Sequence, residues 1–184
     1  MKITLEDVEH VARLLKTGAS PRGAVMGPMA DVIYNSTQFM SDEDLRAIGV
    51  FLKELPQVAP VGATAAMPAS AGFLATGARI YDKQCSDCHG DKGQGAAGAY
   101  PALAGNRAVT MSWPGNLVRG VLSGGFAPAT QGNPRPYGMP PFAQTLDDSD
   151  IAAVVSYVRS SWGNQAGAVT PLEVLKLRDS QGLQ

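Results

Sequence analysis

Five consecutive residues, Cys85-Ser86-Asp87-Cys88-His89, constrain this chain more than any other part of its sequence. They contain both cysteines of the 184-residue chain. The pattern C-x-x-C-H is an attachment site for a c-type haem: the two thiols form thioethers with the porphyrin, and the histidine binds iron from one face. The motif therefore predicts one covalently bound haem c, with Cys85 and Cys88 as attachment points and His89 as an axial ligand.

Zinc binding, thiol redox exchange and a structural disulfide are further roles of a C-x-x-C pair, but they fit the rest of the sequence less well. A zinc site needs about four ligands, and the one histidine besides His89 is His10. A thioredoxin-type redox pair belongs in a βαβ context, which the sequence lacks. A structural disulfide is sterically poor at this spacing outside redox motifs. A chance match to five residues remains the alternative until a second iron ligand is found.

The second iron ligand is expected in the loop that contains Met139. This residue follows His89 by fifty positions, in Tyr137-Gly138-Met139-Pro140-Pro141-Phe142. Methionine is usually core filler, but this one lies in a Gly/Pro loop without helical periodicity. Methionine ligation raises the reduction potential of a haem. Met139 is therefore the predicted second ligand, with Met111 as the nearest rival and Met67 after it.

Composition excludes several classes of protein. A formal net charge of −1 is too balanced for a nucleic-acid-binding surface, and 45% hydrophobic residues are too many for a disordered chain. The 21 glycines and 13 prolines predict long or numerous loops. No stretch approaches the ~18–20 apolar residues of a membrane helix. The first residues do not form a signal peptide, so the chain is either cytoplasmic or a mature or truncated sequence.

Helical periodicity and capping signals predict an all-α fold with long loops. No convincing strand alternation is present, and the segments 90–112 and 124–141 are expected to be loops. Residues 20–34 begin as a loop. The expected helices lie between Thr4 and Gly18, between Ser41 and Pro56, from Ser70 to Gln84, from Trp113 to Ser123, from Asp148 to Trp162, and from Thr170 into the tail.

An internal repeat links the start of the chain to its later part. Two pairs of segments match at one offset of 106 residues: residues 11–18 with 117–124, and residues 41–52 with 147–158. Two amphipathic helices can resemble each other by chance, but the equal spacing and the shared capping pattern argue against that. At this offset the counterpart of Cys85–His89 falls before Met1. Residues 1–56 are therefore expected to be the back half of a domain whose front half is missing.

Several short stretches carry a resemblance to a known family. They are Leu103-Ala104-Gly105-Asn106, Asn116-Leu117-Val118-Arg119, Met139-Pro140-Pro141-Phe142 and residues 157–164. Residues 70–163 resemble a class I cytochrome c domain. More closely, they resemble the last haem domain of the multi-haem cytochrome c subunits of membrane-associated bacterial alcohol, gluconate and aldehyde dehydrogenases. Residues 1–56 resemble the end of the penultimate haem domain of those subunits, although this chain has a single C-x-x-C-H motif.

The resemblance implies a division of the chain into four parts. The expected parts are the C-terminal half of a preceding cytochrome c-like domain at 1–56, a linker at 57–69, a complete cytochrome c domain at 70–163, and a tail with a short helix at 164–184.

The resemblance also implies contacts around the haem. The carbonyl of Pro101 would accept a hydrogen bond from the ring of His89 and so fix the imidazole. Gly77 and Tyr81 match positions where the first helix of the domain crosses its last helix, on which Tyr157 is the aromatic partner. His10 is expected to be an ordinary surface residue. The candidates for contact with the haem propionates are Arg107, Trp113, Arg119 and Arg135. A role as an ordinary surface or packing residue is equally expected for each of them.

The function implied by the resemblance is electron transfer rather than catalysis. With His89 and Met139 as axial ligands, the iron has no open position for a substrate. A dehydrogenase subunit would supply electrons, and a quinone, an oxidase or another cytochrome of the respiratory chain would accept them. Covalent haem attachment outside the cytoplasm implies a periplasmic protein, with membrane association only through partners. The alternative is a labile Met139 that admits peroxide or a diatomic gas, as in a peroxidase or a gas sensor.

The apolar helix faces of residues 1–56 need cover. They are expected to pack on the complete domain or on a second copy of the chain, which would give a homodimer.

Overall fold

The structure is a computed structural model that describes residues 5–21, 23–56 and 68–180. Thr4, Met67 and most of the expected linker at 57–69 lie outside the described residues. The described part is mostly helical, which confirms the predicted fold class. Its helices are α1 (Leu5–Thr17), α2 (Pro28–Asn35), the 3₁₀ helix η1 (Thr37–Phe39), α3 (Asp42–Glu54), α4 (Ala71–Gln84), α5 (Ser86–His89), α6 (Arg107–Thr110), α7 (Gly115–Ser123), α8 (Asp148–Ser160) and α9 (Pro171–Ser180).

Two small antiparallel hairpins correct the expectation of a chain without strands. β1 (Ala19–Ser20) pairs with β2 (Gly23–Ala24), and β3 (Gly125–Phe126) pairs with β4 (Gly138–Met139). Each hairpin follows a helix that ends at a glycine with positive φ, 79° at Gly18 and 60° at Gly124. Strands of two residues leave no alternation to read in a sequence. The two glycines are 106 residues apart, as in the internal repeat.

Some helix boundaries also differ from the prediction. α7 begins at Gly115 instead of Trp113, because Pro114 takes the N-cap position. α2 begins with Pro28 in its first turn, in a segment whose Pro and Gly content indicates a loop. The short helix α6 interrupts the expected loop at 90–112.

Side-chain caps begin four helices where the sequence predicts them. In each case an oxygen of a Ser, Asp or Thr side chain accepts a hydrogen bond from the backbone N–H three residues later. The pairs are Ser41 with Asp44, Ser70 with Phe73, Asp147 with Asp150, and Thr170 with Glu173. The carboxylate of Glu173 also accepts from the N–H of Thr170, which completes the capping box.

The crossing of α4 and α8 forms the centre of the core. Gly77 lies directly against the backbone of α8, so that a methyl group there would overlap the carbonyl of Ala153. One turn further along α4, the buried ring of Tyr81 packs between Tyr157 and Trp162, at centroid separations of 5.6 and 4.8 Å. This close crossing fixes the end of α4, and the C-x-x-C-H motif follows that end directly.

The segment after residue 163 packs into the same core. Val169 and Val174 are fully buried, and the N–H of Val169 donates to the hydroxyl of Ser156 on α8 at 2.8 Å. Arg178 on α9 donates to the carbonyls of Ala143 and Leu146 and pairs with Asp148 at 2.8 Å. We call residues 70–180 the motif domain, because α9 belongs to its core.

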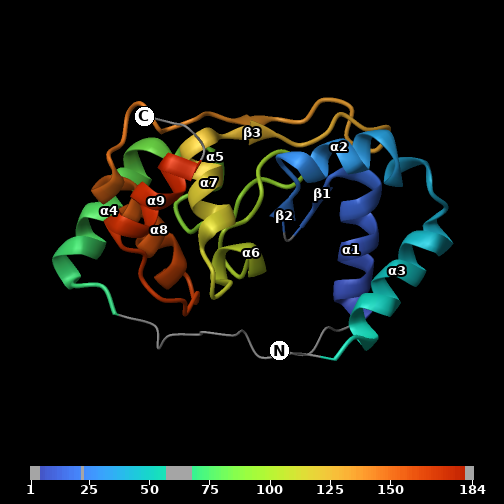
Figure 1. Cartoon of the computed structure of the whole chain (residues 1–184), viewed down its shortest axis with the longest axis horizontal. Coiled ribbons are helices and arrows are strands. Elements are labelled where there is room, and N and C mark those ends of the chain that lie inside the picture. The colour runs from blue at the N-terminus through green and yellow to red at the C-terminus, as the bar shows by residue number, and fades with distance from the viewer. Residues whose placement is uncertain (1–4, 22, 57–67, 181–184) are drawn as a thin grey trace.

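Residues 5–21 and 23–56 form a second, smaller body, which we call the N-terminal unit (Figure 1). Its helices α1 and α3 pack where Gly49 meets Val8, and an ion pair between Arg46 and Glu9 at 3.0 Å lies beside this contact. In Figure 1 the chain between β3 and β4 extends from the motif domain across to the top of α1 and α2. An ion pair between Arg107 and the mostly buried Asp7, at 3.9 Å, also joins the two parts. The N-terminal unit thus packs on the motif domain, which is one of the two arrangements expected for it.

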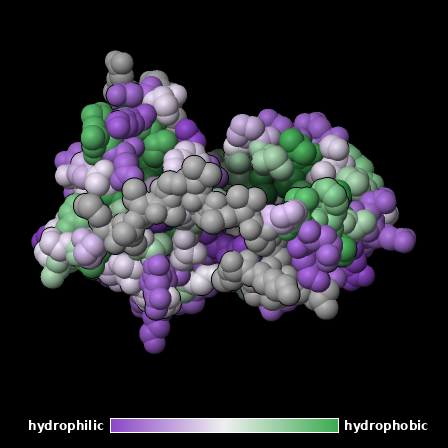
Figure 2. All heavy atoms as spheres, turned by 60° about the horizontal axis from the view of Figure 1, so that its bottom comes forward, coloured by the Kyte–Doolittle hydropathy of each residue, from purple (hydrophilic) through white to green (hydrophobic). Residues whose placement is uncertain are grey.

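Part of the N-terminal unit remains uncovered by the motif domain. Figure 2 shows hydrophobic side chains among polar ones on this part of the surface, at the right. The exposed large apolar side chains of the N-terminal unit are Met29, Val32, Tyr34, Phe39, Val50, Phe51, Leu52 and Leu55.

His10 is less exposed than expected for a surface residue. Its Nδ1 is buried without a hydrogen-bond partner, and its Nε2 lies 3.9 Å from Glu6. Its helix, α1, packs against α3, η1 and α2. Among the described residues, no helix combines the length and the apolar character needed to cross a bilayer.

Candidate haem-binding site

The C-x-x-C-H motif forms one helical turn at the end of α4. At the end of α4, the N–H of Cys85 donates to the carbonyl of Tyr81 at 2.9 Å. The carbonyl of Cys85 accepts a hydrogen bond from the N–H of His89, also at 2.9 Å. Positions i, i+3 and i+4 lie on one face of a helix, so Cys85, Cys88 and His89 share a face. Gly90 ends this turn with a φ of 78°. Both cysteines are free thiols. This arrangement suits attachment of a porphyrin at two points beside one imidazole.

The thiols lie in a poorly solvated environment. Burial, with a smaller contribution from the neighbouring Cys88, raises the pKa of Cys85 to about 11. Before it is attached to a haem, Cys85 is therefore a neutral thiol at physiological pH. Within the described ranges, no group of three or more His, Cys, Asp or Glu side chains is placed to hold a metal ion.

The imidazole of His89 is buried and held by a backbone carbonyl. Its Nδ1 lies 2.9 Å from the carbonyl oxygen of Pro101. A carbonyl can only accept, so Nδ1 carries the proton and Nε2 keeps its lone pair for a metal. Burial lowers the pKa of His89, and this effect is larger than that of the Pro101 hydrogen bond, which raises the pKa. The ring is therefore kept in the neutral form that ligates iron.

A glycine-rich loop brings Pro101 to this position. The carbonyl of Gly93 accepts the N–H groups of both Leu103 and Ala104, at 2.7 and 2.9 Å. Gly95 has a φ of 66°, and a methyl group there would lie 2.7 Å from the carbonyl carbon of Pro101. The loop therefore folds back on itself so tightly that position 95 needs glycine.

Tyr100 connects the motif with the segment that contains Met139. Burial and the neighbouring thiol of Cys88 raise the pKa of Tyr100, which places its hydroxyl beside Cys88. Its ring packs on Tyr137 with a centroid separation of 5.1 Å. Tyr137 precedes Met139 by two residues. The Met139 hairpin thus lies beside the C-x-x-C-H turn, although fifty residues separate the two in the sequence.

Met139 itself lies in β4, opposite Gly125 of β3. The neighbouring Gly124 packs against its backbone, because a methyl group at Gly124 would overlap the carbonyl of Met139 and lie 2.7 Å from the carbonyl carbon of Pro140. The Met139 side chain is half-buried. The rival Met111 is 49% exposed, and its carbonyl accepts a hydrogen bond from the buried Arg159.

The structure does not bring the four propionate candidates together. The guanidinium of Arg119 lies over the ring of Trp113, 5.3 Å from its centroid, and Trp113 is 52% exposed. Arg107 pairs with Asp7 of the N-terminal unit, and Arg135 is exposed in the loop before Met139.

Sequence reasoning missed the aromatic residues that connect these segments. Tyr100 and Tyr137 are aromatic residues in loops, each within two positions of a candidate site residue, and that proximity was the available signal. The ring of Trp162 packs against Gly93, and the backbone of Trp162 itself has a positive φ of 53°. A side chain in this backbone region is rare, and nothing in the sequence indicates it.

Comparison with known proteins identifies the class. The family model for cytochrome c matches residues 74–162. Cytochrome c-552 of Thermus thermophilus is 34% identical in an alignment that is 137 positions long and covers 60% of this chain and 99% of that protein. The chain belongs to the cytochrome c family, and its function is electron transfer through a covalently bound c-type haem.

Longer relatives match nearly the whole chain and confirm the resemblance to dehydrogenase cytochrome c subunits. The cytochrome c subunit of the quinone alcohol dehydrogenase of Gluconacetobacter polyoxogenes is 40% identical in an alignment that is 181 positions long and covers 94% of this chain. The gluconate 2-dehydrogenase cytochrome c subunit of Pantoea cypripedii is 33% identical in an alignment that is 185 positions long and covers 96% of this chain. The chain spans 39% and 42% of the length of these two relatives.

Proposed function

We propose that this chain relays single electrons from a dehydrogenase to the respiratory chain through one haem with His89 and Met139 as axial ligands. One observation carries the proposal. Tyr100-Pro101 contacts both sides of the site: Pro101 accepts from His89 Nδ1, and Tyr100 contacts Cys88 and Tyr137, next to Met139. This arrangement supports a site in which one face of the porphyrin meets His89 and the other meets the Met139 hairpin.

The residues of the site have separate roles in this proposal. Cys85 and Cys88 hold the porphyrin through thioethers, Nε2 of His89 and Sδ of Met139 bind iron, and Pro101 fixes the imidazole. When bound, the haem iron supplies one-electron chemistry by changing between its ferric and ferrous states. With His89 and Met139 both bound to iron, the chain itself would keep substrates from the metal.

The partners and the location follow from the relatives and from the cofactor. The relatives are named as cytochrome c subunits of dehydrogenases that act on alcohol and gluconate, which supports a dehydrogenase as electron donor. A quinone, an oxidase or another cytochrome is the proposed acceptor. Covalent haem attachment outside the cytoplasm supports a periplasmic location, with any membrane association provided by the partners.

The haem assignment is tested by counting haem and iron in the purified protein. We expect one haem per chain, which stays with the polypeptide on a denaturing gel. The double variant Cys85→Ala/Cys88→Ala should lose the covalent haem, whereas His10→Ala, at the histidine outside the motif, should keep it. Haem that is extracted from the wild type by acidified solvent, or a protein without a Soret band, would contradict the assignment.

We also infer that residues 1–56 are the back half of a cytochrome c-like domain and that their uncovered face joins two copies of the chain. At the offset of 106 residues, Phe51 of α3 corresponds to Tyr157 of α8. Tyr157 packs on Tyr81 and Trp162, whereas Phe51 is 64% exposed. An apolar face with this exposure is typical of an interaction site.

Sedimentation of the haem-loaded chain tests this association. We expect a dimer that Phe51→Asp dissociates, because a carboxylate placed in an apolar interface is costly to desolvate. Leu172→Asp, at an equally exposed position on α9, should leave the dimer intact. A monomeric wild type from which proteolysis readily removes residues 1–56 would refute the homodimer.

A further inference from the structure

The segment that ends at Met139 has little regular structure of its own. Between β3 and β4 the chain runs through residues 127–137, where the described pairing is one bridge between Thr130 and Asn133. This connection is long for two paired strands, which are usually joined by about 2–5 residues. Local opening of such a segment costs little free energy by itself. Its conformation, and with it the position of Met139, therefore depends on what packs against it.

The end of α1 holds the middle of this segment. The hydroxyl of Thr130, which is 4% exposed, donates to the carbonyl of Thr17 at 3.0 Å. Gly18 lies flat against the ring of Pro128, where a methyl group would overlap the ring carbons. A methyl group added at Gly132, further along the segment, would lie 2.5 Å from Cγ2 of Thr17. The segment thus lies in close contact with the last residues of α1.

Met26 of the N-terminal unit covers the base of the same hairpin. A methyl group added at Gly125 would lie 3.4 Å from Sδ of Met26, and one added at Gly120 would lie 3.6 Å from its Cε. Gly125 is the residue that pairs with Met139. Met26 therefore contacts the strand partner of the proposed ligand.

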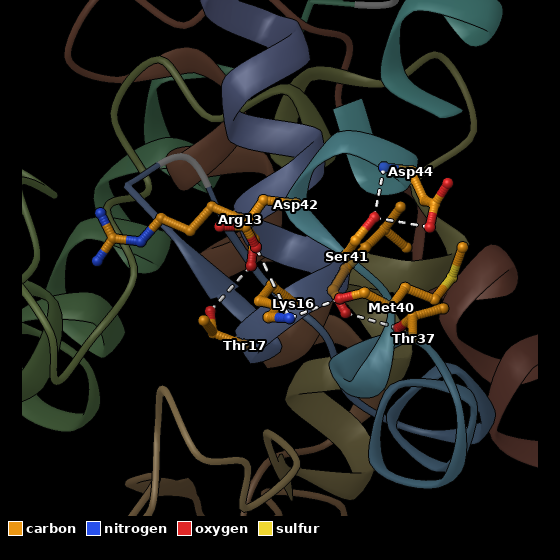
Figure 3. A network of polar contacts seen from close by, with 9 residues as sticks. Arg13, Lys16, Thr17, Thr37, Met40, Ser41, Asp42 and Asp44 are labelled. Carbon is orange, nitrogen blue, oxygen red and sulfur yellow. Dashed lines mark hydrogen bonds and ion pairs between the residues drawn. The ribbon is translucent and has the colours of Figure 1, made fainter. Parts of the chain in front are cut away.

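The end of α1 is itself held firmly from the opposite side (Figure 3). Lys16 donates to the carbonyl of Met40 at 2.6 Å and pairs with Asp42 at 3.7 Å. The hydroxyl of Thr37 donates to the carbonyl of Leu15, also at 2.6 Å. Because several contacts share this task, loss of one leaves the others in place. Thr17 therefore offers its carbonyl to Thr130 from a fixed position.

We propose that Thr130 and Met26 are positioning residues that keep Met139 on the haem iron. This inference rests on the proposed ligation by Met139. Dissociation of Met139 requires the hairpin to open, and opening breaks the Thr130–Thr17 hydrogen bond and the Met26 contact. The N-terminal unit thus acts as a clamp that closes the sixth coordination position and keeps the chain an electron carrier.

The binding of carbon monoxide to the reduced, haem-loaded chain measures this opening. We expect Met26→Ala/Thr130→Val to bind carbon monoxide about 10-fold faster than the wild type, because it loses one buried hydrogen bond and one apolar contact. Thr130→Ser keeps the hydroxyl and should bind at the wild-type rate. The matched control is Val32→Ala/Ser160→Ala, which removes an exposed apolar side chain and a side-chain hydrogen bond to the carbonyl of Ser156 on α8, away from the loop and from the end of α1.

The results distinguish a failure of the clamp from a failure of the proposed iron binding by Met139. A wild type without a methionine-to-iron charge-transfer band would refute ligation by Met139, and the clamp with it. If the wild type has that band but both double variants bind carbon monoxide at equal rates, the clamp alone is refuted. General destabilisation of the protein would then account for any faster binding. Far-UV circular dichroism shows whether each variant folds. If the double variant does not fold, the single variants Met26→Ala and Thr130→Val, each expected to bind carbon monoxide faster than the wild type, keep the test valid.

Discussion

The variant Met139→Ala is expected to lose the methionine-to-iron charge-transfer band and to bind carbon monoxide rapidly when reduced. Removal of the thioether leaves one coordination position without a protein ligand. The reduction potential should fall by on the order of 0.1 V, because axial ligands set haem potentials over a range of about 0.8 V and methionine raises them. Absorbance spectra, stopped-flow mixing with carbon monoxide and redox titration measure the three effects.

Met111→Ala is the matched control for this variant. Met111 is the nearest rival for the ligand by sequence, but its side chain is 49% exposed and α6, just before it, connects to α8 through Arg159. The substitution leaves its carbonyl in place, so the Arg159 hydrogen bond persists. We expect wild-type spectra. If Met111→Ala loses the charge-transfer band and Met139→Ala keeps it, the assignment of the ligand is wrong.

The parts of the fold that the sequence predicted are those governed by local rules. Ser41, Ser70, Asp147 and Thr170 each cap a helix, because capping depends on side chains three residues apart. The C-x-x-C-H turn was readable for the same reason, since its spacing fits a single helical turn. Such local signals also placed Met139 outside the periodic helices, although it lies in the two-residue strand β4 instead of the expected loop.

The parts that escaped prediction depend on contacts between distant residues. Nothing near Trp162 indicates its positive φ, which follows from packing on Tyr81 and Gly93. The hairpins escaped because a two-residue strand has no period, and α2 escaped because Pro28 in a helix start resembles Pro in a loop. The packing of residues 164–180 into the core depends on Arg178 reaching carbonyls more than thirty positions away.

The variant Gly77→Ala is expected to lower the free energy of unfolding by about 3 kcal/mol, at the upper end of the cost of overpacking a core. The added methyl group would overlap the carbonyl oxygen of Ala153 and lie 2.7 Å from its carbonyl carbon. A backbone carbonyl in the middle of α8 cannot rotate away as a side chain can. The two helices must therefore separate, which also disturbs the Tyr81 contacts with Tyr157 and Trp162. Urea denaturation followed by circular dichroism measures the loss.

Gly72→Ala, on the same helix, separates this clash from a general effect of alanine. A methyl group at Gly72 meets nothing within 4 Å, so the helix preference of alanine should stabilise the protein by up to about 1 kcal/mol. The two substitutions are chemically identical and five residues apart, and they are expected to differ in sign. If Gly77→Ala were as stable as Gly72→Ala, the close crossing of α4 and α8 would be refuted. The fixed position of the C-x-x-C-H turn at the end of α4 would then need another cause.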